Sequence, residues 1–271
     1  MLNVNTKLFA ILGCPIKQSR SPIMQNNWFK EAGLNCAYTA FSVEKKDLKK
    51  VFETLKLLGF CGFNITVPHK VEIMKLLDFI DPAPKAIGSV NTILIKNGKT
   101  YGYNTDYLGI EKDFADKKIS VEGKTIFIYG AGGAAKSVLY FAQKNKAKSV
   151  YISNRTHSKA ISLAKQFGAK AIELKDSSAY IAESDIIINA SSCGLNKGDK
   201  LPFAINSVKK GAIAYDLIYA DNTALCKLAK QKKIKFFNGE GMLINQGISA
   251  FEIWTGLKPS AASAKRILRK N

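Results

Sequence analysis

A glycine-rich turn between an apolar strand and a helix constrains the fold of this chain more than any other feature. The run TIFIYGAGGAAKSVLYFA begins at Thr125 and places Gly130, Gly132 and Gly133 directly after the strand. These glycines permit a tight turn and let a pyrophosphate approach the helix N-terminus, whose free N–H groups favour anions. The pattern matches G-x-G-x-x-G/A, with Ala135 at the last position. A turn with a purely structural role is the alternative, but the strand–turn–helix context favours a dinucleotide-binding domain.

The segment after the next strand indicates which dinucleotide is bound. An NAD site places Asp or Glu about 20 residues beyond the turn, where it accepts a hydrogen bond from the ribose 2′-hydroxyl. This chain has SNRTHSK there, from Ser153 to Lys159, with no carboxylate. Arg155 can form charge-assisted hydrogen bonds with a 2′-phosphate and stack on adenine. The sequence therefore predicts NADP rather than NAD.

Apolar runs of strand length alternate with helical stretches along nearly the whole chain, in two series. Short β-branched strands separated by helices of 10 to 15 residues predict parallel βαβ units. Asn97-Gly98 lies between two strands of the first series and predicts a hairpin. The strands of the first series are KLFAILG, CAYTAFSV, FCGFNITV and the two hairpin strands; those of the second are TIFIYG, SVYISNR, AKAIEL, DIIINAS, AIAYDL and IKFFNG.

The net charge of the chain bears on the kind of partner it binds but does not identify one. The chain has 41 Lys and Arg against 21 Asp and Glu, a formal net charge of +20. Nucleic-acid modules concentrate Lys and Arg among aromatic residues. Here the lysines are spread evenly, which favours a lysine-rich solvated surface, although a positive field would still attract a small anionic substrate or a phosphorylated cofactor.

Other classes are disfavoured by composition. A hydrophobic content of 46% is too high for a disordered chain. No uncharged apolar run approaches the roughly 18–20 residues of a membrane span, and the N-terminus lacks the basic region of a signal peptide. The five cysteines are scattered without a C-x-x-C pair and the two histidines lie far apart. We therefore expect no metal site, and a soluble protein of a reducing, cytoplasmic compartment.

Nine short motifs occur in an order that resembles the shikimate dehydrogenase family. They are GCPIKQSRSP, NITVPHK, SVNT, GYNTD, GAGGAAK, SNRT, NASSCGL (Asn189 to Leu195), YDLIY and GEGMLINQG. The resemblance implies reversible NADPH-dependent reduction of 3-dehydroshikimate to shikimate, a step of chorismate and aromatic amino-acid biosynthesis.

The resemblance also implies the fold class and domain organisation. We expect an α/β protein with a Rossmann-type parallel-sheet NADP-binding domain at 109–242. An α/β substrate-binding and catalytic domain at 1–108 is joined by C-terminal helices at 243–271, with a cleft between the two domains. The joint is expected within Gly109 to Gly123, as a polar helix.

Ketone reduction requires hydride delivery to carbon and a proton for the developing alkoxide. By resemblance, Lys70 is the catalytic lysine that supplies this proton and accepts it in the reverse reaction. Asp106 would hold both the ammonium group and the same substrate hydroxyl. An ordinary surface Lys–Asp pair is the alternative if the motifs are disregarded. His69 is adjacent to Lys70, but side chains alternate along extended backbone, so we do not expect it to be the base.

The same resemblance assigns two further groups of residues. Substrate-binding residues offer hydroxyl and amide groups for a carboxylate and three ring hydroxyls; they are Ser19, Ser21, Asn64, Thr66, Asn91, Tyr219 and Gln246. Cofactor-binding residues surround the glycine turn and the ends of later strands; they are Gly130, Ala131, Gly132, Gly133, Ala134, Asn154, Arg155, Thr156, Lys159, Ser191, Leu217, Gly239 and Met242.

Two alternatives to this function remain open at the level of sequence. One is a quinate/shikimate dehydrogenase with relaxed nucleotide use, because quinate tolerance cannot be inferred from these motifs. The other, from a different class, is a basic nucleic-acid-binding protein, which would show steep salt dependence of binding. The favoured interpretation expects a small-molecule substrate, no nucleic acid, no membrane, and a monomer or homodimer.

Overall fold

The computed structural model describes residues 2–194 and 198–270. Leu195, the last residue of the NASSCGL motif, lies outside the described residues. The chain divides into two compact units. The first unit comprises Met1–Gly109 and Ile244–Asn271, and the second comprises Ile110–Leu243.

The first unit is built on a six-stranded mixed sheet with the order β2-β1-β3-β5-β6-β4. β1 runs parallel to β2 and β3, whereas β5 is antiparallel to both β3 and β6. The predicted hairpin joins β5 to β6, with positive φ angles at Asn97 and Gly98. Its elements are β1 (Lys7–Gly13), α1 (Ser21–Glu31), β2 (Cys36–Ser42), η1 (Lys45–Asp47), α2 (Leu48–Leu57), β3 (Phe60–Ile65), η2 (Glu72–Leu76), β4 (Phe79–Ile80), α3 (Pro82–Ile87), β5 (Thr92–Lys96) and β6 (Lys99–Tyr103).

Alternation along β1 gives this sheet two apolar faces. Ala10 and Leu12 belong to a core cluster that includes the buried residues of α2. Phe9 points the other way, with its ring centroid 5.3 Å from that of Phe29 in α1 and 5.0 Å from that of Trp254. Successive side chains of a strand face opposite sides, so this one strand contacts helices on both faces.

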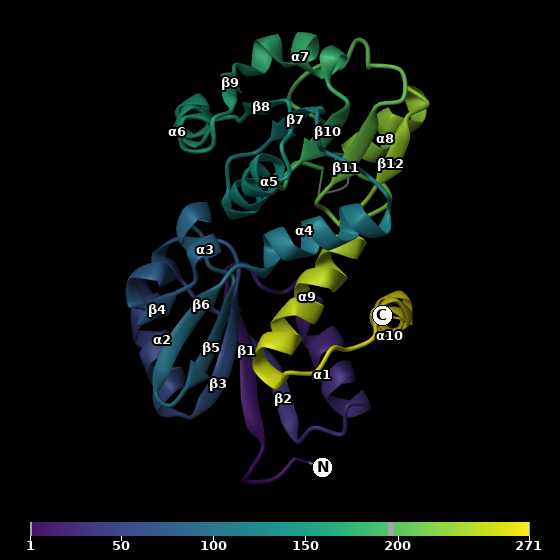
Figure 1. Cartoon of the computed structure of the whole chain (residues 1–271). Helices are drawn as coiled ribbons and strands as arrows, with labels where there is room; N and C mark the ends of the chain where they lie inside the picture. Colours follow the sequence, from purple (N-terminus) through teal and green to yellow (C-terminus); the bar gives the residue numbers. More distant parts are fainter. Residues whose placement is uncertain (1, 195–197, 271) are drawn as a thin grey trace. The chain divides into compact units, whose positions relative to one another are not determined.

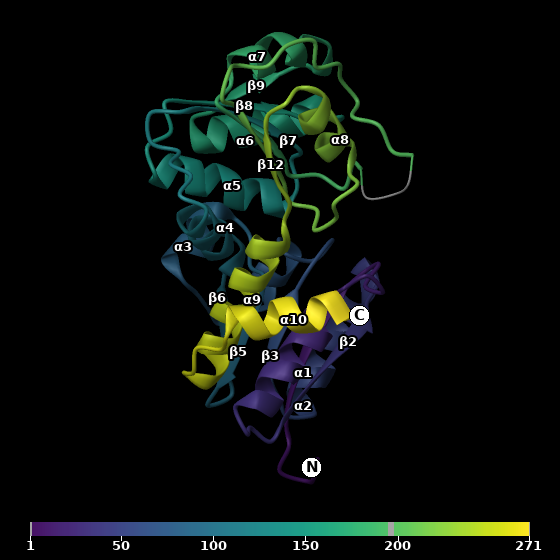
Figure 2. The ribbon, with the colours of Figure 1, turned by 90° about the vertical axis from the view of Figure 1, so that its right-hand side faces the viewer.

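The C-terminal helices complete the first unit. α9 (Glu240–Thr255) supplies Trp254, and α10 (Ala261–Lys270) lies beside α1 (Figure 2). The Trp28 indole N–H donates to the backbone oxygen of Ser260 and to Ser263 Oγ, each at 3.1 Å. The last segment of the chain is therefore anchored on its N-terminal helix.

The second unit has a six-stranded sheet with the order β12-β11-β10-β7-β8-β9, and every neighbouring pair is parallel. This arrangement confirms the predicted Rossmann-type sheet. The elements of this unit are β7 (Thr125–Tyr129), α5 (Gly133–Lys144), β8 (Ser149–Ser153), α6 (His157–Phe167), β9 (Lys170–Ile172), η3 (Leu174–Asp176), α7 (Ser177–Glu183), β10 (Ile186–Asn189), β11 (Ile213–Asp216), α8 (Ala224–Gln231) and β12 (Lys235–Phe237).

Helices cover both faces of this parallel sheet (Figure 1). Ile126 and Ile128 of β7 pack in a cluster with residues of α5 and α6. Phe127 and Tyr129 face the opposite side, where they cluster with residues of α7 and α8. Burial on both faces explains why this strand is a continuous apolar run rather than an alternating one.

Helix α4 (Thr105–Asp116) begins earlier than the polar helix expected within 109–123. Asn104 Oδ1 accepts a 3.2 Å hydrogen bond from the backbone N–H of Tyr107, which is the geometry of a helix cap. The helix ends at Asp116, and Lys118 adopts a positive φ of 56°. The cap in the GYNTD motif therefore starts the helix directly after β6.

No helix within residues 2–194 and 198–270 combines the length and the apolar composition required to cross a membrane.

Candidate active site

Lys70 and Asp106 form a largely buried ion pair in the first unit. Lys70 follows the turn that closes β3, and its Nζ lies 2.6 Å from Asp106 Oδ2 in the first turn of α4. The two side chains are 13% and 7% exposed. His69 is buried instead, with Nε2 2.7 Å from the backbone oxygen of Val43. Of these two residues, Lys70 is the one that pairs with a carboxylate, whereas the His69 ring contacts the backbone.

Asn91 fixes the second oxygen of Asp106. Its Nδ2 donates to Asp106 Oδ1 at 2.8 Å and to Thr105 Oγ1 at 3.0 Å. Its Oδ1 accepts from the backbone N–H of Thr105 at 2.6 Å. Both oxygens of the Asp106 carboxylate are thus engaged, which holds it in one orientation.

The polar network continues from Asn91 through three further buried side chains. Thr92 Oγ1 donates to Asn91 Oδ1 at 3.1 Å and accepts from Asn64 Nδ2 at 3.0 Å. Tyr38 then donates its hydroxyl to Asn64 Oδ1 at 2.6 Å. Burial raises the pKa of Tyr38 well above its usual value, and a hydrogen bond with Ser21 opposes this rise in part. A fully satisfied network of this kind rigidifies its members because unpaired buried polar groups are costly.

The remaining first-unit residues from the predicted substrate site lie on neighbouring elements. Ser21 is the first residue of α1 and is buried, and its N–H lies 3.4 Å from Ser19 Oγ. The methyl group of Thr66 packs so closely on Gly13 that a Cβ at Gly13 would overlap it. Gln246 is half-buried on α9.

In the second unit, the glycine turn leaves open space before the first residue of α5. Gly130 has a φ of 123°, and a Cβ there would lie 2.6 Å from the Ala190 carbonyl oxygen, so only glycine fits. Gly132 precedes the first residue of α5, and a Cβ at Gly132 would have no heavy atom within 4 Å. Ala131 and Ala134 flank this opening, where the free N–H groups of the α5 N-terminus favour an anion.

The residues after β8 follow the glycine turn along the same edge of the sheet. Arg155 is exposed. Burial raises the pKa of Tyr129, and the Arg155 charge opposes this rise in part. Asn154 Nδ2 donates to the backbone oxygen of Thr156 at 3.0 Å, which shapes the turn into α6. Lys159 is exposed in the first turn of that helix.

The other predicted cofactor residues follow the carboxyl ends of β10, β11 and β12. Ser191 Oγ donates to Asn189 Oδ1 at 2.7 Å, and the Leu217 N–H donates to the Asn189 backbone oxygen at 2.9 Å. Gly239 lies against Leu217, whose carbonyl oxygen a Cβ would overlap. Met242 is buried and Tyr219 is 39% exposed. In parallel α/β sheets, ligands bind at this carboxyl edge.

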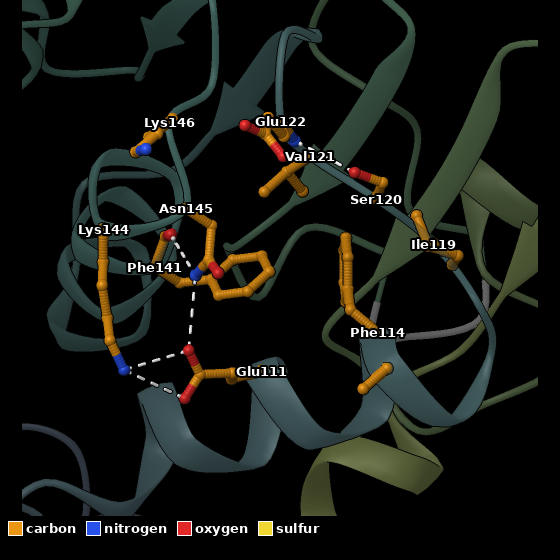
Figure 3. A pocket seen from close by; sticks show the side chains of 11 residues that line it. Glu111, Phe114, Ile119, Ser120, Val121, Glu122, Phe141, Lys144, Asn145 and Lys146 are labelled. Atoms are coloured by element: carbon orange, nitrogen blue, oxygen red, sulfur yellow. Dashed lines mark hydrogen bonds and ion pairs between the residues drawn. The ribbon is translucent and has the colours of Figure 1, made fainter.

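A cavity of about 350 Å³ lies elsewhere in the second unit (Figure 3). Phe114 and Phe141 line it, together with Glu111, which accepts from Lys144 Nζ at 3.0 Å and from Asn145 Nδ2 at 3.4 Å. Lys144 ends α5, whereas the glycine turn begins that helix. The cavity is therefore at the opposite end of α5 from the glycine turn.

Sequence reasoning missed several residues that support these sites. Thr92 lies in the SVNT motif and Thr105 in the GYNTD motif, but neither is among the predicted site residues. Tyr38 lies outside all nine motifs. The buried Asp216 ends β11, where its Oδ1 accepts from Asn189 Nδ2 and from the Ile218 N–H, both at 3.0 Å. Over the described residues, no group of three or more His, Cys, Asp or Glu is placed to hold a metal ion.

A parallel α/β sheet with a glycine-rich turn, together with a buried lysine–carboxylate pair, is the arrangement expected of a nicotinamide-dependent oxidoreductase. Comparison with known proteins narrows that class. The chain belongs to the shikimate dehydrogenase family. Three family models match it: "Shikimate dehydrogenase substrate binding domain" at residues 11–93, "Shikimate / quinate 5-dehydrogenase" at 113–196, and "Shikimate 5'-dehydrogenase C-terminal domain" at 239–269.

Individual relatives match over nearly their whole length. The NADP(+) shikimate dehydrogenase of Aquifex aeolicus is 42% identical, over 99% of this chain and 98% of that protein. The corresponding protein of Methanocaldococcus jannaschii is 41% identical over the same shares. A crystal structure of shikimate dehydrogenase from Aquifex aeolicus superposes with a TM-score of 0.94 at 41% identity, covering 99% of this chain and 100% of that one.

Proposed function

We propose that this chain catalyses the reversible NADPH-dependent reduction of 3-dehydroshikimate to shikimate, through a proton transfer by Lys70. The family membership supports the reaction, and the 2.6 Å contact between Lys70 Nζ and Asp106 Oδ2 is the observation that carries the mechanism. The reaction belongs to aromatic amino-acid biosynthesis. An ammonium group held beside a carboxylate in a partly buried position is suited to deliver a proton to a developing alkoxide.

NADP fits the residues present at the edge of the second sheet. The opening at Gly132 leaves room for a pyrophosphate, and the segment from Ser153 to Lys159 offers Arg155 and Lys159 without a carboxylate. When bound, NADPH supplies the hydride that reduces the substrate carbonyl carbon. Arg155 would bind the 2′-phosphate, and the N–H groups at the start of α5 would bind the pyrophosphate.

The first unit supplies the groups for the substrate. As the carbonyl carbon accepts hydride, Lys70 donates a proton from Nζ to the carbonyl oxygen, and in the oxidation direction Nζ takes that proton back. Asp106 holds the ammonium group in position. Asn64, Asn91 and Thr66 would bind ring hydroxyls, and Ser19 and Ser21 would bind the carboxylate. Tyr219 and Gln246 would complete the substrate-binding group.

The proposal also includes the cellular compartment, the oligomeric state and the kind of partner of the enzyme. All five cysteines are free, which is typical of a reducing compartment. We therefore infer a cytoplasmic enzyme. We further propose that it acts as a monomer or homodimer, and the family membership supports a small molecule rather than nucleic acid as its partner.

One steady-state experiment tests the substrate and the nucleotide together. Shikimate and quinate are each offered with NADP+ and with NAD+, and nicotinamide reduction is followed by absorbance. We expect efficient turnover for shikimate with NADP+ and at least about tenfold lower kcat/KM when NAD+ replaces it, because each charge-assisted hydrogen bond to the 2′-phosphate contributes substantially. Equal kcat/KM for quinate with NAD+ would favour the quinate/shikimate alternative instead.

A further inference from the structure

Asp113 is a buried carboxylate that the proposed chemistry does not use. It lies in α4 and is 3% exposed. Tyr215 donates its hydroxyl to Asp113 Oδ2 at 2.6 Å, and Lys117, one helical turn further on, pairs with Oδ1. A buried carboxylate is tolerated only where such partners compensate for lost hydration. The contact also stabilises the neutral phenol, because burial and the adjacent Asp113 charge both raise the pKa of Tyr215.

The Asp113 carboxylate also supports the backbone at the start of α9. A Cβ on Gly241 would overlap Asp113 Oδ1 and would lie 2.5 Å from Asp113 Cγ and 2.8 Å from Lys117 Nζ. The backbone at Gly241 therefore rests directly on this ion pair. A side chain at Gly241 would displace these two side chains, whereas the backbone conformation itself does not demand glycine, because Gly241 is not among the residues with positive φ.

The same segment is held from a second side by the two residues that follow β11. Gly239 donates its N–H to the Ile218 backbone oxygen at 3.1 Å and lies against the backbone of Leu217. Tyr215 lies in β11, two residues before Leu217. Lys117 Nζ lies 5.9 Å from the Tyr215 ring centroid and 5.5 Å from that of Phe237 in β12. Asp113 and its two partners thus join α4, β11 and β12 beneath the turn that begins α9.

We infer that Asp113 is a positioning residue, which through Tyr215 and Lys117 fixes the turn Gly239–Met242 in the conformation that NADP binding requires. This inference rests on the proposed function, because Gly239 and Met242 are among the residues proposed to contact the cofactor. α4 carries Asp106 in its first turn and Asp113 seven residues later. One helix therefore supplies both the partner of Lys70 and the carboxylate that contacts Gly241.

The test uses Asp113→Asn in the full chain, with nucleotide binding measured by titration calorimetry and turnover measured separately. Asparagine keeps the shape and can still accept from Tyr215, but it loses the charge that pairs with Lys117. We expect the NADP+ Kd and KM to rise about tenfold, while the shikimate KM changes less than about twofold, since a hydrogen bond to a charged group contributes on this scale. Asp116→Asn is the matched control, because Asp116 lies on the same helix in an exposed pair with Lys112; it should leave both constants unchanged.

A folded Asp113→Asn variant with an NADP+ Kd within twofold of wild type would overturn the inference, even if its unfolding temperature falls. Should that variant not fold, Tyr215→Phe decides, because it keeps the packed ring and removes only the donor. We expect Tyr215→Phe to raise the NADP+ Kd about threefold or more, and an unchanged Kd would equally overturn the inference. Calorimetry reports binding without turnover, so the failure of wild-type protein to oxidise shikimate would contradict the proposed function separately.

Discussion

The side-chain amide of Asn91 donates a 2.8 Å hydrogen bond to Asp106 Oδ1, while Lys70 occupies Oδ2 of the same carboxylate. The carboxylate is thereby fixed from two directions by residues of different segments, one following α3 and one following β3. Its orientation toward Lys70 is therefore a property of the folded first unit.

Removing the Asn91 amide should affect both stability and catalysis. In Asn91→Ala, the Thr105 N–H and Asp106 Oδ1 lose buried partners, so the free energy of unfolding should fall by about 1–3 kcal/mol. Because Asp106 also loses its orientation, kcat should fall about tenfold or more, with a smaller change in the NADP+ KM. Urea unfolding and steady-state kinetics measure the two effects. Asn206→Ala, an exposed position whose backbone contacts survive, is the control; equal effects in both variants would contradict this role for Asn91.

Arg155 should determine the preference for NADP over NAD. Arg155→Ala removes the exposed guanidinium that follows β8, and the NADP+ KM should rise about 10- to 100-fold, the range expected for charge-assisted hydrogen bonds to a phosphate. The NAD+ KM should stay nearly constant, because NAD+ has no 2′-phosphate. Lys165→Ala on the exposed face of α6 controls for the loss of one positive charge. An unchanged NADP+ KM in Arg155→Ala would place the 2′-phosphate elsewhere.

Asp216 should make stability depend on pH. Burial raises its pKa to about 6 from the usual value of 3.8, although hydrogen bonds from the Ile218 N–H, Thr223 and Asn189 oppose the shift. Between these two pKa values the native state binds more protons than the unfolded state, so the free energy of unfolding falls as pH rises and levels off above about 6. A difference of about two pKa units corresponds to about 3 kcal/mol.

The comparison with Asp216→Asn isolates this contribution. Urea unfolding of the wild type and of Asp216→Asn between about pH 3 and 7, a range that includes both pKa values, should show that the decline is lost in the variant. If the difference in unfolding free energy between the two proteins is independent of pH, Asp216 does not titrate in this range.

The parts of the fold that local patterns determine were predictable from sequence. The strand at Lys7–Gly13 and the hairpin at Asn97-Gly98 occur as expected, because alternation, turn residues and strand length are all encoded within a few residues. Helix α4 begins at Thr105, before the range 109–123 predicted for it, because Asn104 caps the helix from within the GYNTD motif. The strand order of the first sheet could not be predicted from local sequence patterns, because it depends on pairing between segments that are distant in sequence.

For the candidate site, the sequence predicted which residues take part but not the contacts that hold them. Family motifs named Lys70, Asp106, Asn64 and Asn91, and their assigned roles remain predictions. The contacts that hold them were not foreseeable: Tyr38 reaches Asn64 from a strand with no motif, and Tyr215 reaches Asp113 across 102 positions of sequence. Such pairings depend on tertiary packing, which periodicity and spacing do not specify.

The rate of hydride transfer in Lys70→Ala tests the central claim most directly. NADPH oxidation is followed in a single turnover with saturating 3-dehydroshikimate, beside wild type and beside Lys75→Ala, whose exposed side chain pairs with Glu72. The account predicts that Lys70→Ala lowers this rate about 10²- to 10⁴-fold, the usual contribution of a positioned proton donor, while the substrate KM changes little and Lys75→Ala matches wild type. A Lys70→Ala rate close to that of wild type would remove Lys70 from the proton transfer and contradict the account.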